Sequence, residues 1–280
     1  MTKSLKPEYL HGSTFPVSWE DILTSRVGFY KFIKGSLRDR FHHYLLTFME
    51  EKEFVGVGGF SITNEVKLIV SSSAVKLVLF LGLDCYSHLK CIEVSNASLG
   101  GKTVGFMDFD GRIRLNWRET KISSYDYNDG YNLVIHEFAH LLDLNHGYFD
   151  GLPSQGFGPD EKNLRATLYE YYDQYVCSDS EQKLKKRTTE RNEYKILLEI
   201  LTSYGLKSEA EFFAMATEMF FELPWKFREL LPLLYKKFSL YYRWDPAEFF
   251  VKETKDICAI SSPFYNAPEV YDYLYRYAGI

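Results

Sequence analysis

The spacing of apolar and polar residues predicts helices in the first third of the chain. Residues 37–54 carry apolar side chains at helical spacing, with polar side chains between them. A second helix is predicted over residues 62–82, with Thr63 as its N-terminal cap. The apolar run of this second helix includes Lys67, Lys76 and three serines. We therefore predict that the helix is buried in the protein and does not cross a membrane.

Short strands are predicted next. Residues 91–95 read as one strand, and residues 103–117 read as a hairpin that turns at Asp110 and Gly111, a dipeptide favoured in tight turns. Helices are predicted again from Asn132 onward. This order of elements predicts an α+β fold that is mainly helical, with a small sheet or hairpin beside the helix that follows Asn132.

The composition is that of a globular protein, with 46% hydrophobic and 25% charged residues. A net charge of −5 gives no electrostatic reason to expect nucleic acid or a membrane as a partner. The four cysteines form no C-x-x-C pair and the N-terminus has no signal-peptide core, so we predict a cytoplasmic protein. Without repeats or a linker, residues 1–280 are predicted to form one domain, in which about residues 1–90 pack on residues 91–280.

The segment NLVIHEFAHLLD, residues 132–143, places polar side chains in an otherwise apolar helix. His136 and His140 lie one turn apart, so their Cβ atoms are about 5–6 Å from each other. Two imidazoles then face one point, as a zinc ion bound at about 2.0–2.1 Å requires. Glu137 follows about 100° further around the helix, where its carboxylate can act on a water molecule as a general base.

A purely structural role for this pair is the alternative to a metal site. Histidines four apart also form simple hydrogen bonds in cores, and H-E-x-x-H arises by chance in roughly one of a hundred such chains. Residues 133–135 are apolar, so the first turn of the helix is expected to be buried and to hold the site rigidly. Asp143 falls on the same face as both histidines and is expected to orient one imidazole through its free N–H. We therefore favour a metal site.

A catalytic zinc ion takes three protein ligands and leaves a position for water. His146 stands six residues after His140, but the glycine that would turn the chain back to the metal is replaced by Asp143. We therefore expect His146 to be a loop residue near the site and look for the third ligand on another helix.

Residues 208–224 form the better source of that ligand. Ser208 is a suitable cap for this helix, and Glu211 and Glu218 lie two turns apart on one face. Both acids are surrounded by phenylalanine and methionine residues, and a carboxylate in such surroundings usually has a charged partner. The candidates for the third ligand are therefore carboxylates of this helix.

The chain resembles the Mlc titration factor A family of zinc metallopeptidases, which are gluzincin-like and similar in their catalytic unit to anthrax lethal factor. The resemblance covers most of the chain, and its most specific segments are HEFAHLLD, residues 136–143, and EAEFFAMATEMFF, residues 209–221. It implies a zincin-like fold with one zinc ion per chain.

The resemblance also implies roles for individual residues. It makes Glu211 the third zinc ligand beside His136 and His140. Glu137 becomes the general base, and Tyr204 falls where the family places a tyrosine beside the metal. Glu218, together with Asp143, is then expected to support the ligands.

Two functions follow from the resemblance. The first is zinc-dependent hydrolysis of peptide bonds, in its narrower form an aminopeptidase acting on small peptides. The second is a regulatory protein that sequesters a transcriptional repressor, with peptidase activity secondary. The complete HEFAH motif favours the enzyme, because a binding protein has no need of Glu137. The expected partners are a peptide substrate and a repressor protein, and neither nucleic acid nor a membrane is expected.

The sequence leaves the roles of three segments near the motifs open. Residues 112–117 are taken as an edge strand, which either pairs with an extended substrate or has no such role. The loop of residues 146–160, with four Gly and two Pro, either covers the cleft or is a plain connector. Residues 155–203 form a longer connection than the family pattern and leave the substrate preference open.

Overall fold

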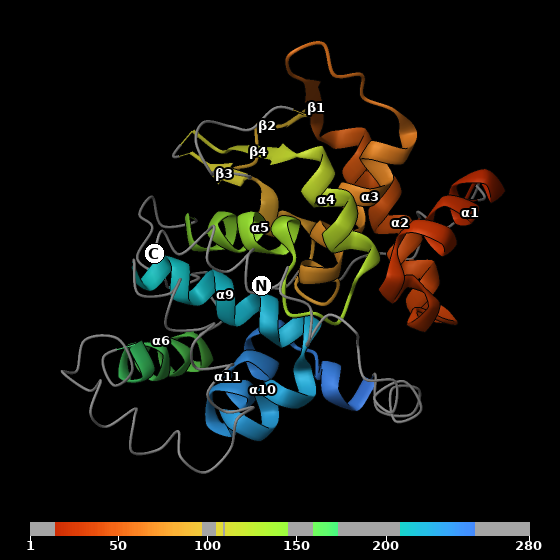
Figure 1. The fold of residues 1–280 in the computed structure, drawn as a ribbon. Helices are drawn as coiled ribbons and strands as arrows, with labels where there is room; N and C mark the ends of the chain where they lie inside the picture. Colours follow the sequence, from red (N-terminus) through yellow and green to blue (C-terminus); the bar gives the residue numbers. More distant parts are fainter. Residues whose placement is uncertain (1–14, 97–104, 109, 145–158, 173–207, 250–280) are drawn as a thin grey trace, which may run out of the picture.

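The computed structural model describes residues 15–96, 105–108, 110–144, 159–172 and 208–249. These residues are mainly helical and include one small sheet, which confirms the predicted α+β class (Figure 1). The elements before the metal-motif helix are α1 (Val17–Arg26), η2 (Gly28–Phe32), α2 (Ser36–Glu51), β1 (Glu53–Gly56), α3 (Asn64–Val78), η3 (Leu83–Tyr86), β2 (Cys91–Ser95), β3 (Gly105–Met107), β4 (Arg112–Asn116) and α4 (Trp117–Tyr125). The later elements are α5 (Leu133–Asp143), α6 (Pro159–Tyr172), α9 (Glu209–Glu222), α10 (Pro224–Leu230) and α11 (Pro232–Tyr242).

The sheet has the strand order β1-β2-β4-β3. Strands β1, β2 and β4 are parallel, and β3 runs antiparallel to β4 with Phe106 opposite Arg114. The hairpin of β3 and β4 confirms the predicted turn. Gly111 adopts φ +78° there, and a Cβ atom at this position would collide with the carbonyl oxygen of His88. Only glycine fits both the backbone conformation and the space.

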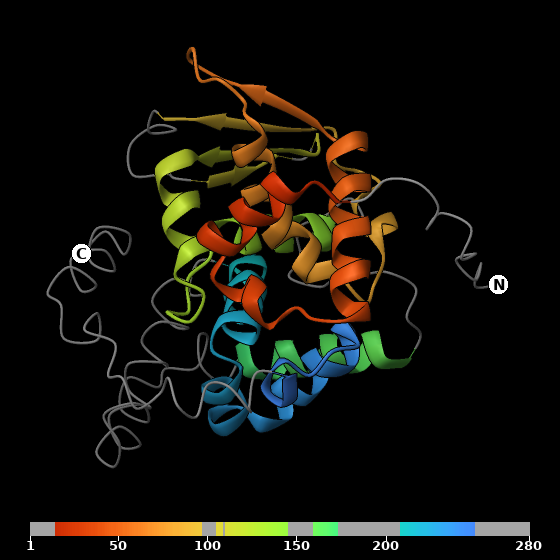
Figure 2. The same ribbon diagram turned by 90° about the vertical axis from the view of Figure 1, so that its right-hand side faces the viewer.

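The elements are stacked in layers. Figure 1 shows the sheet at one end, α5 beneath it, α9 beneath α5, and helices α6, α10 and α11 at the other end, and Figure 2 shows the same order from the side. Helix α3 packs against α1, α2, α4 and α5. Its residues from Leu68 to Val78 are all buried, which confirms that the apolar run is a core helix. Within the described residues, no helix combines the length and apolar character needed to cross a membrane.

The caps predicted from the sequence are present. Thr63 accepts a hydrogen bond from the N–H of Val66 at the start of α3. Ser208 accepts one from the N–H of Glu211 at the start of α9. Each cap satisfies a backbone donor that has no partner within the helix, and so fixes the residue at which the helix begins. This is why the positions of α3 and α9 follow from the sequence.

Two sequence predictions about strands are wrong. The helix predicted over residues 37–54 ends at Glu51, and residues 53–56 form β1 because they pair with β2. Residues 112–117 are not an edge strand, since β4 is bonded to β2 on one side and to β3 on the other. Local residue spacing carries no information about strand order, because the partners lie far away in the sequence.

Aromatic rings connect α5 to the elements above it. The ring centroid of Phe138 lies 5.0 Å from that of Tyr86 in η3 and 6.0 Å from that of Phe48 in α2. All three side chains are fully buried. Edge-to-face and tilted ring pairs of this kind add to the stabilisation from burial. Phe138 therefore anchors the core face of α5.

The first prediction follows from this anchor. Phe138→Ala should lower the free energy of unfolding by about 3–5 kcal/mol, because the lost ring leaves a cavity in a packed core. Denaturant unfolding measures this loss. Ile122→Ala, at a side chain that is 49% exposed, is the control and should change stability little. Equal, small effects of both substitutions would contradict the anchoring role.

Candidate metal centre

The sequence motif lies on α5, which begins at a side-chain cap. Oδ1 of Asn132 accepts a hydrogen bond from the N–H of Ile135 at 3.1 Å. The apolar face of the helix is fully buried, as shown by Val134, Phe138 and Leu141. The opposite face carries His136, Glu137 and His140 toward α9 and β3. The cap and the apolar face together fix where the polar side chains point.

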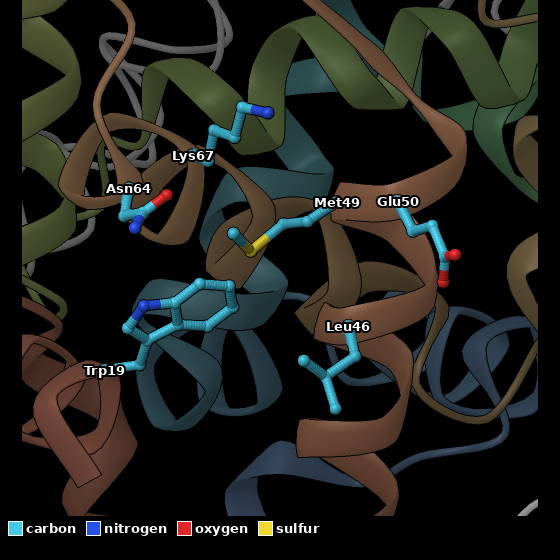
Figure 3. Close-up of a pocket in the computed structure, with 6 residues that line it drawn as sticks. All are labelled: Trp19, Leu46, Met49, Glu50, Asn64 and Lys67. Carbon is cyan, nitrogen blue, oxygen red and sulfur yellow. The ribbon is translucent and has the colours of Figure 1, made fainter. Parts of the chain in front are cut away.

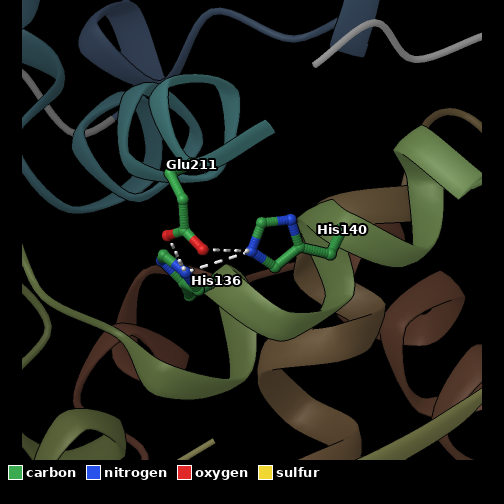
Figure 4. Close-up of side chains that lie close together, drawn as sticks. All are labelled: His136, His140 and Glu211. Carbon is green, nitrogen blue, oxygen red and sulfur yellow. Dashed lines mark hydrogen bonds and ion pairs between the residues drawn. The ribbon is translucent and has the colours of Figure 1, made fainter. Parts of the chain in front are cut away.

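Helix α9 brings a carboxylate to the two imidazoles (Figure 4). Nε2 of His136 lies 3.2 Å from Oε2 of Glu211, and Nε2 of His140 lies 3.6 Å from Oε1 of Glu211. The two Nε2 atoms are 3.2 Å apart. Each of the three side chains is partly open to solvent, at 12%, 11% and 26% exposure for His136, His140 and Glu211. A ligand from solvent can therefore reach the point they share.

The distance between the two Nε2 atoms and the contact of Glu211 with His136 are close to the edges of a tetrahedron of ligand atoms, while the contact of Glu211 with His140 is made by its other oxygen. Ligand atoms bound tetrahedrally at about 2.0–2.1 Å, as histidine binds zinc, lie about 3.3 Å from one another. One donor atom from each residue lies within 4.8 Å of the others, so His136, His140 and Glu211 could hold one metal ion. This chemistry needs two neutral imidazoles and one carboxylate.

Glu218 fixes the outer side of His136. Its Oε1 lies 2.7 Å from Nδ1 of His136, and its Oε2 accepts a hydrogen bond from the backbone N–H of Asn132 at 2.7 Å. A carboxylate at Nδ1 selects the tautomer in which Nδ1 carries the proton and Nε2 is free to bind a metal. The structure therefore places Glu218 where the sequence analysis expected a supporting residue.

Burial and neighbouring charges shift the pKa values of the two histidines in opposite directions. Burial, together with the charge of His136, lowers the pKa of His140 to about 3. Burial also opposes the charged form of His136, but the carboxylates of Glu218 and Glu211 outweigh it and hold the pKa of His136 well above its ordinary value. A cation between the ligands would replace the proton on Nε2 of His136.

Glu137 lies against the edge of the sheet. Its side chain is buried, and burial raises its pKa to about 8. The backbone of β3 approaches so closely at Gly105 that a Cβ atom there would collide with Oε1 of Glu137. Any larger residue at Gly105 would therefore displace the carboxylate. The sequence analysis did not identify Gly105, whose importance depends on the packing of β3 on α5.

The other predicted residues are placed as follows. Asp143 is fully buried in the last turn of α5, and its orienting role stays a prediction. Tyr204, His146 and the loop of residues 146–160, except for its last two residues in α6, lie outside the described residues. Of residues 155–203, the structure describes only 159–172, as helix α6.

A surface pocket lies on a different part of the protein (Figure 3). Its volume is about 280 Å³, and its lining side chains come from α1, α2 and α3. They are Trp19, Leu46, Met49, Glu50, Asn64 and Lys67. None of them belongs to the predicted site.

Comparison with known proteins gives a family match over most of the chain. The family described as glucose-regulated metallo-peptidase M90 matches residues 2–243. The uncharacterized protein slr2042 of Synechocystis sp. is 28% identical over 248 residues, which cover 82% of this chain and 85% of the relative.

Two further relatives carry the name Mlc titration factor A. The protein of Serratia proteamaculans is 25% identical over 71% of this chain and 76% of its own length. The protein of Yersinia enterocolitica is 33% identical over 137 residues, 49% of this chain and 46% of its own length. The second alignment therefore spans about half of each protein.

The second prediction concerns metal content. The purified protein should carry about one divalent transition metal ion per chain, and His136→Ala/His140→Ala should remove it, because a single remaining carboxylate cannot hold the ion. Elemental analysis gives the content directly. His88→Ala, at an exposed histidine, is the control and should leave the metal in place. Metal that persists in the double variant would exclude this site.

Proposed function

From the premise that the chain belongs to the glucose-regulated metallo-peptidase M90 family, we propose that it is a zinc-dependent peptidase. The family match confirms the family expected from the sequence. The observation that carries the proposal is the convergence of Nε2 of His136, Nε2 of His140 and the Glu211 carboxylate, with one donor atom of each residue within 4.8 Å of the others. Two imidazoles and a carboxylate are a typical ligand set of a catalytic zinc ion.

Zinc, when bound, supplies the Lewis acidity that polarises a carbonyl group and lowers the pKa of a water molecule to about 7. The role proposed for Glu137 is that of a general base, whose carboxylate would take a proton from the attacking water molecule and pass it to the leaving amine. Its carboxylate is buried, and burial favours the protonated form that results once the proton has been taken up.

Three other groups complete the proposed mechanism. Glu218 accepts a hydrogen bond from the Nδ1–H of His136 and keeps that ring oriented. Tyr204, as the family resemblance implies, donates a hydrogen bond to the oxyanion of the tetrahedral transition state. Asp143, buried at the end of α5, is proposed to orient one imidazole through its free N–H.

Strand β3 is the proposed binding edge for an extended peptide. Among the described strands, it pairs only with β4, and Gly105 brings its backbone next to Glu137. An added strand along β3 would place backbone amides of the peptide beside the general base. The substrate strand is thus proposed for β3, in place of residues 112–117.

The narrower proposals concern substrate and setting. We propose an aminopeptidase acting on small peptides, a single domain over residues 1–280 and a cytoplasmic location. The alternative function is sequestration of a transcriptional repressor. Relatives named Mlc titration factor A support this alternative by their name. The convergence of His136, His140 and Glu211 beside Glu137 favours the peptidase.

The third prediction tests the base. Glu137→Gln keeps the size of the side chain but removes the proton acceptor, so zinc should stay bound while peptide cleavage falls at least ~100-fold. A library of free and N-acetylated peptides measures cleavage, and an aminopeptidase cuts only the free ones. Cleavage at an unchanged rate in Glu137→Gln would reject the mechanism. A zinc-loaded protein that cuts no peptide would favour the repressor-binding alternative.

The fourth prediction tests the approach of β3 to the base. Gly105→Ala should displace the Glu137 carboxylate and lower kcat about 10–100-fold, since misplacement of a reacting group by about 1 Å has effects of this size. Zinc content should not change, because Glu137 is not a ligand. Leu240→Ala, at a side chain of α11 that is 47% exposed and lies outside β3, is the control and should leave kcat unchanged. Equal rates for both variants would show that the contact is unimportant.

A further inference from the structure

Helix α9 carries three buried or partly buried carboxylates on one stripe. Glu211, Glu218 and Glu222 are seven and four residues apart, which places them on the same face of the helix, toward α5. Glu211 faces the two histidine Nε2 atoms, and Glu218 faces Nδ1 of His136. Glu222 has no part in the proposed mechanism, yet its side chain is completely buried.

Glu222 is paired with a buried lysine from α3. Nζ of Lys76 lies 3.1 Å from Oε1 of Glu222 and donates to the carbonyl oxygen of Phe221 at 3.2 Å. The ring of Phe29 lies 4.5 Å from the same ammonium group. Neither charged side chain has any exposed surface. Lysine and glutamate are almost never fully buried unless they are paired.

Asn132 links this ion pair to the histidine. Its Nδ2 donates to Oε1 of Glu222 at 3.4 Å and to the carbonyl oxygen of Ser123 at 3.1 Å. Its backbone N–H donates to Oε2 of Glu218, whose other oxygen faces Nδ1 of His136. The side chain that caps α5 is therefore held by Glu222, and the backbone of the same residue holds Glu218.

We propose that Lys76, Glu222 and Asn132 are positioning residues of the metal centre. They form a continuous chain of polar contacts from α3 through Glu222 and Asn132 to Glu218, and so fix the Glu218 carboxylate and the His136 ring for metal binding. The inference rests on the metal site of the proposed function, and it does not depend on which bond the enzyme cleaves. Groups that orient a ligand from outside typically change metal affinity 10–100-fold when they are lost.

A simpler role for the ion pair is stabilisation of the fold. A buried pair is weak evidence for that role, because its desolvation opposes its attraction, and apolar replacements of a whole pair are often neutral. The two roles make different predictions about zinc. If the ion pair only stabilises the fold, its loss lowers the melting temperature and leaves zinc affinity unchanged. If the pair positions the metal ligands through Asn132, its loss weakens zinc binding.

The fifth prediction uses zinc affinity, measured by competition with a chromophoric chelator, together with the melting temperature of the zinc-free protein. Lys76→Met leaves Glu222 without its counter-ion, and Glu222→Leu removes the acceptor for Nδ2 of Asn132. Each should weaken zinc binding about 10-fold. In Lys76→Met/Glu222→Gln the amide oxygen can again accept from Asn132 without a buried charge, so zinc affinity should return close to that of the unmodified protein.

The matched control is Tyr86→Phe. It removes the buried hydrogen bond from the Tyr86 hydroxyl to the carbonyl oxygen of Ala74, two residues before Lys76 on α3. The melting temperature should fall while zinc affinity stays unchanged, because this hydrogen bond is not part of the chain of contacts from Lys76 to Glu218. If Lys76→Met or Glu222→Leu does not fold, Asn132→Ser keeps a capping oxygen, loses the Nδ2 donor and should weaken zinc binding.

Two results would overturn the inference in distinguishable ways. Variants that melt earlier but bind zinc as tightly as the unmodified protein would limit the pair to a stabilising role. An unmodified protein that binds no zinc would overturn the inference and the metal site together. Zinc binding without peptide cleavage would reject only the proposed peptidase, and the affinities of the variants would still decide the role of Lys76.

Discussion

The contact of α5 with α9 is the constraint on which the site depends. One helix supplies two imidazoles and a carboxylate, and the other supplies a stripe of three acids. The backbone N–H of Asn132 donates to Glu218, so the residue that caps the metal-motif helix is bonded to the acid that orients His136. A shift of either helix along its axis would break the cap, the carboxylate contact and the ligand geometry together.

The rest of the fold holds these two helices in place. Phe138 and its ring contacts join α5 to α2 and η3, while α9 is covered by α6, α10 and α11 on its other side. The sheet lies above α5 and brings the backbone of β3 to Glu137 at Gly105. The helical part of the chain before residue 90 contributes directly as well, because Lys76 of α3 reaches Glu222 of α9.

Much of this arrangement could be predicted where it rests on local sequence. The i, i+4 spacing of His136 and His140 and the caps at Thr63 and Ser208 depend on residues within one or two helical turns, and they are found as expected. Strand order could not be predicted this way, because β1 and β4 are defined by pairing with distant strands. The bond between Lys76 and Glu222 joins residues on helices far apart in the sequence, so only the fold reveals it.

The signal for Lys76 was nevertheless present in the sequence, as a lysine in the middle of the most apolar run. A buried ammonium group requires a negative partner, but the local sequence does not say which acid supplies it.

The pairing of Lys76 with Glu222 offsets part of the negative charge that is buried in the core. Glu137, Glu218 and Glu222 are buried and Glu211 is mostly buried, and burial disfavours the ionised form of a carboxylate. Lys76 supplies one positive charge at the Glu222 end of the stripe. At the Glu211 end, the negative charge is offset by bound protons. The carboxylates of Glu218 and Glu211 hold the pKa of His136 well above its usual value, and burial raises the pKa of Glu137 to about 8. A divalent cation at the three ligand atoms would take the place of those protons, lower the energy of the ionised carboxylates and free Glu137 to accept a proton. The acids of α9 are thus paired with a buried lysine at one end and, in the proposed enzyme, with an exchangeable cation at the other.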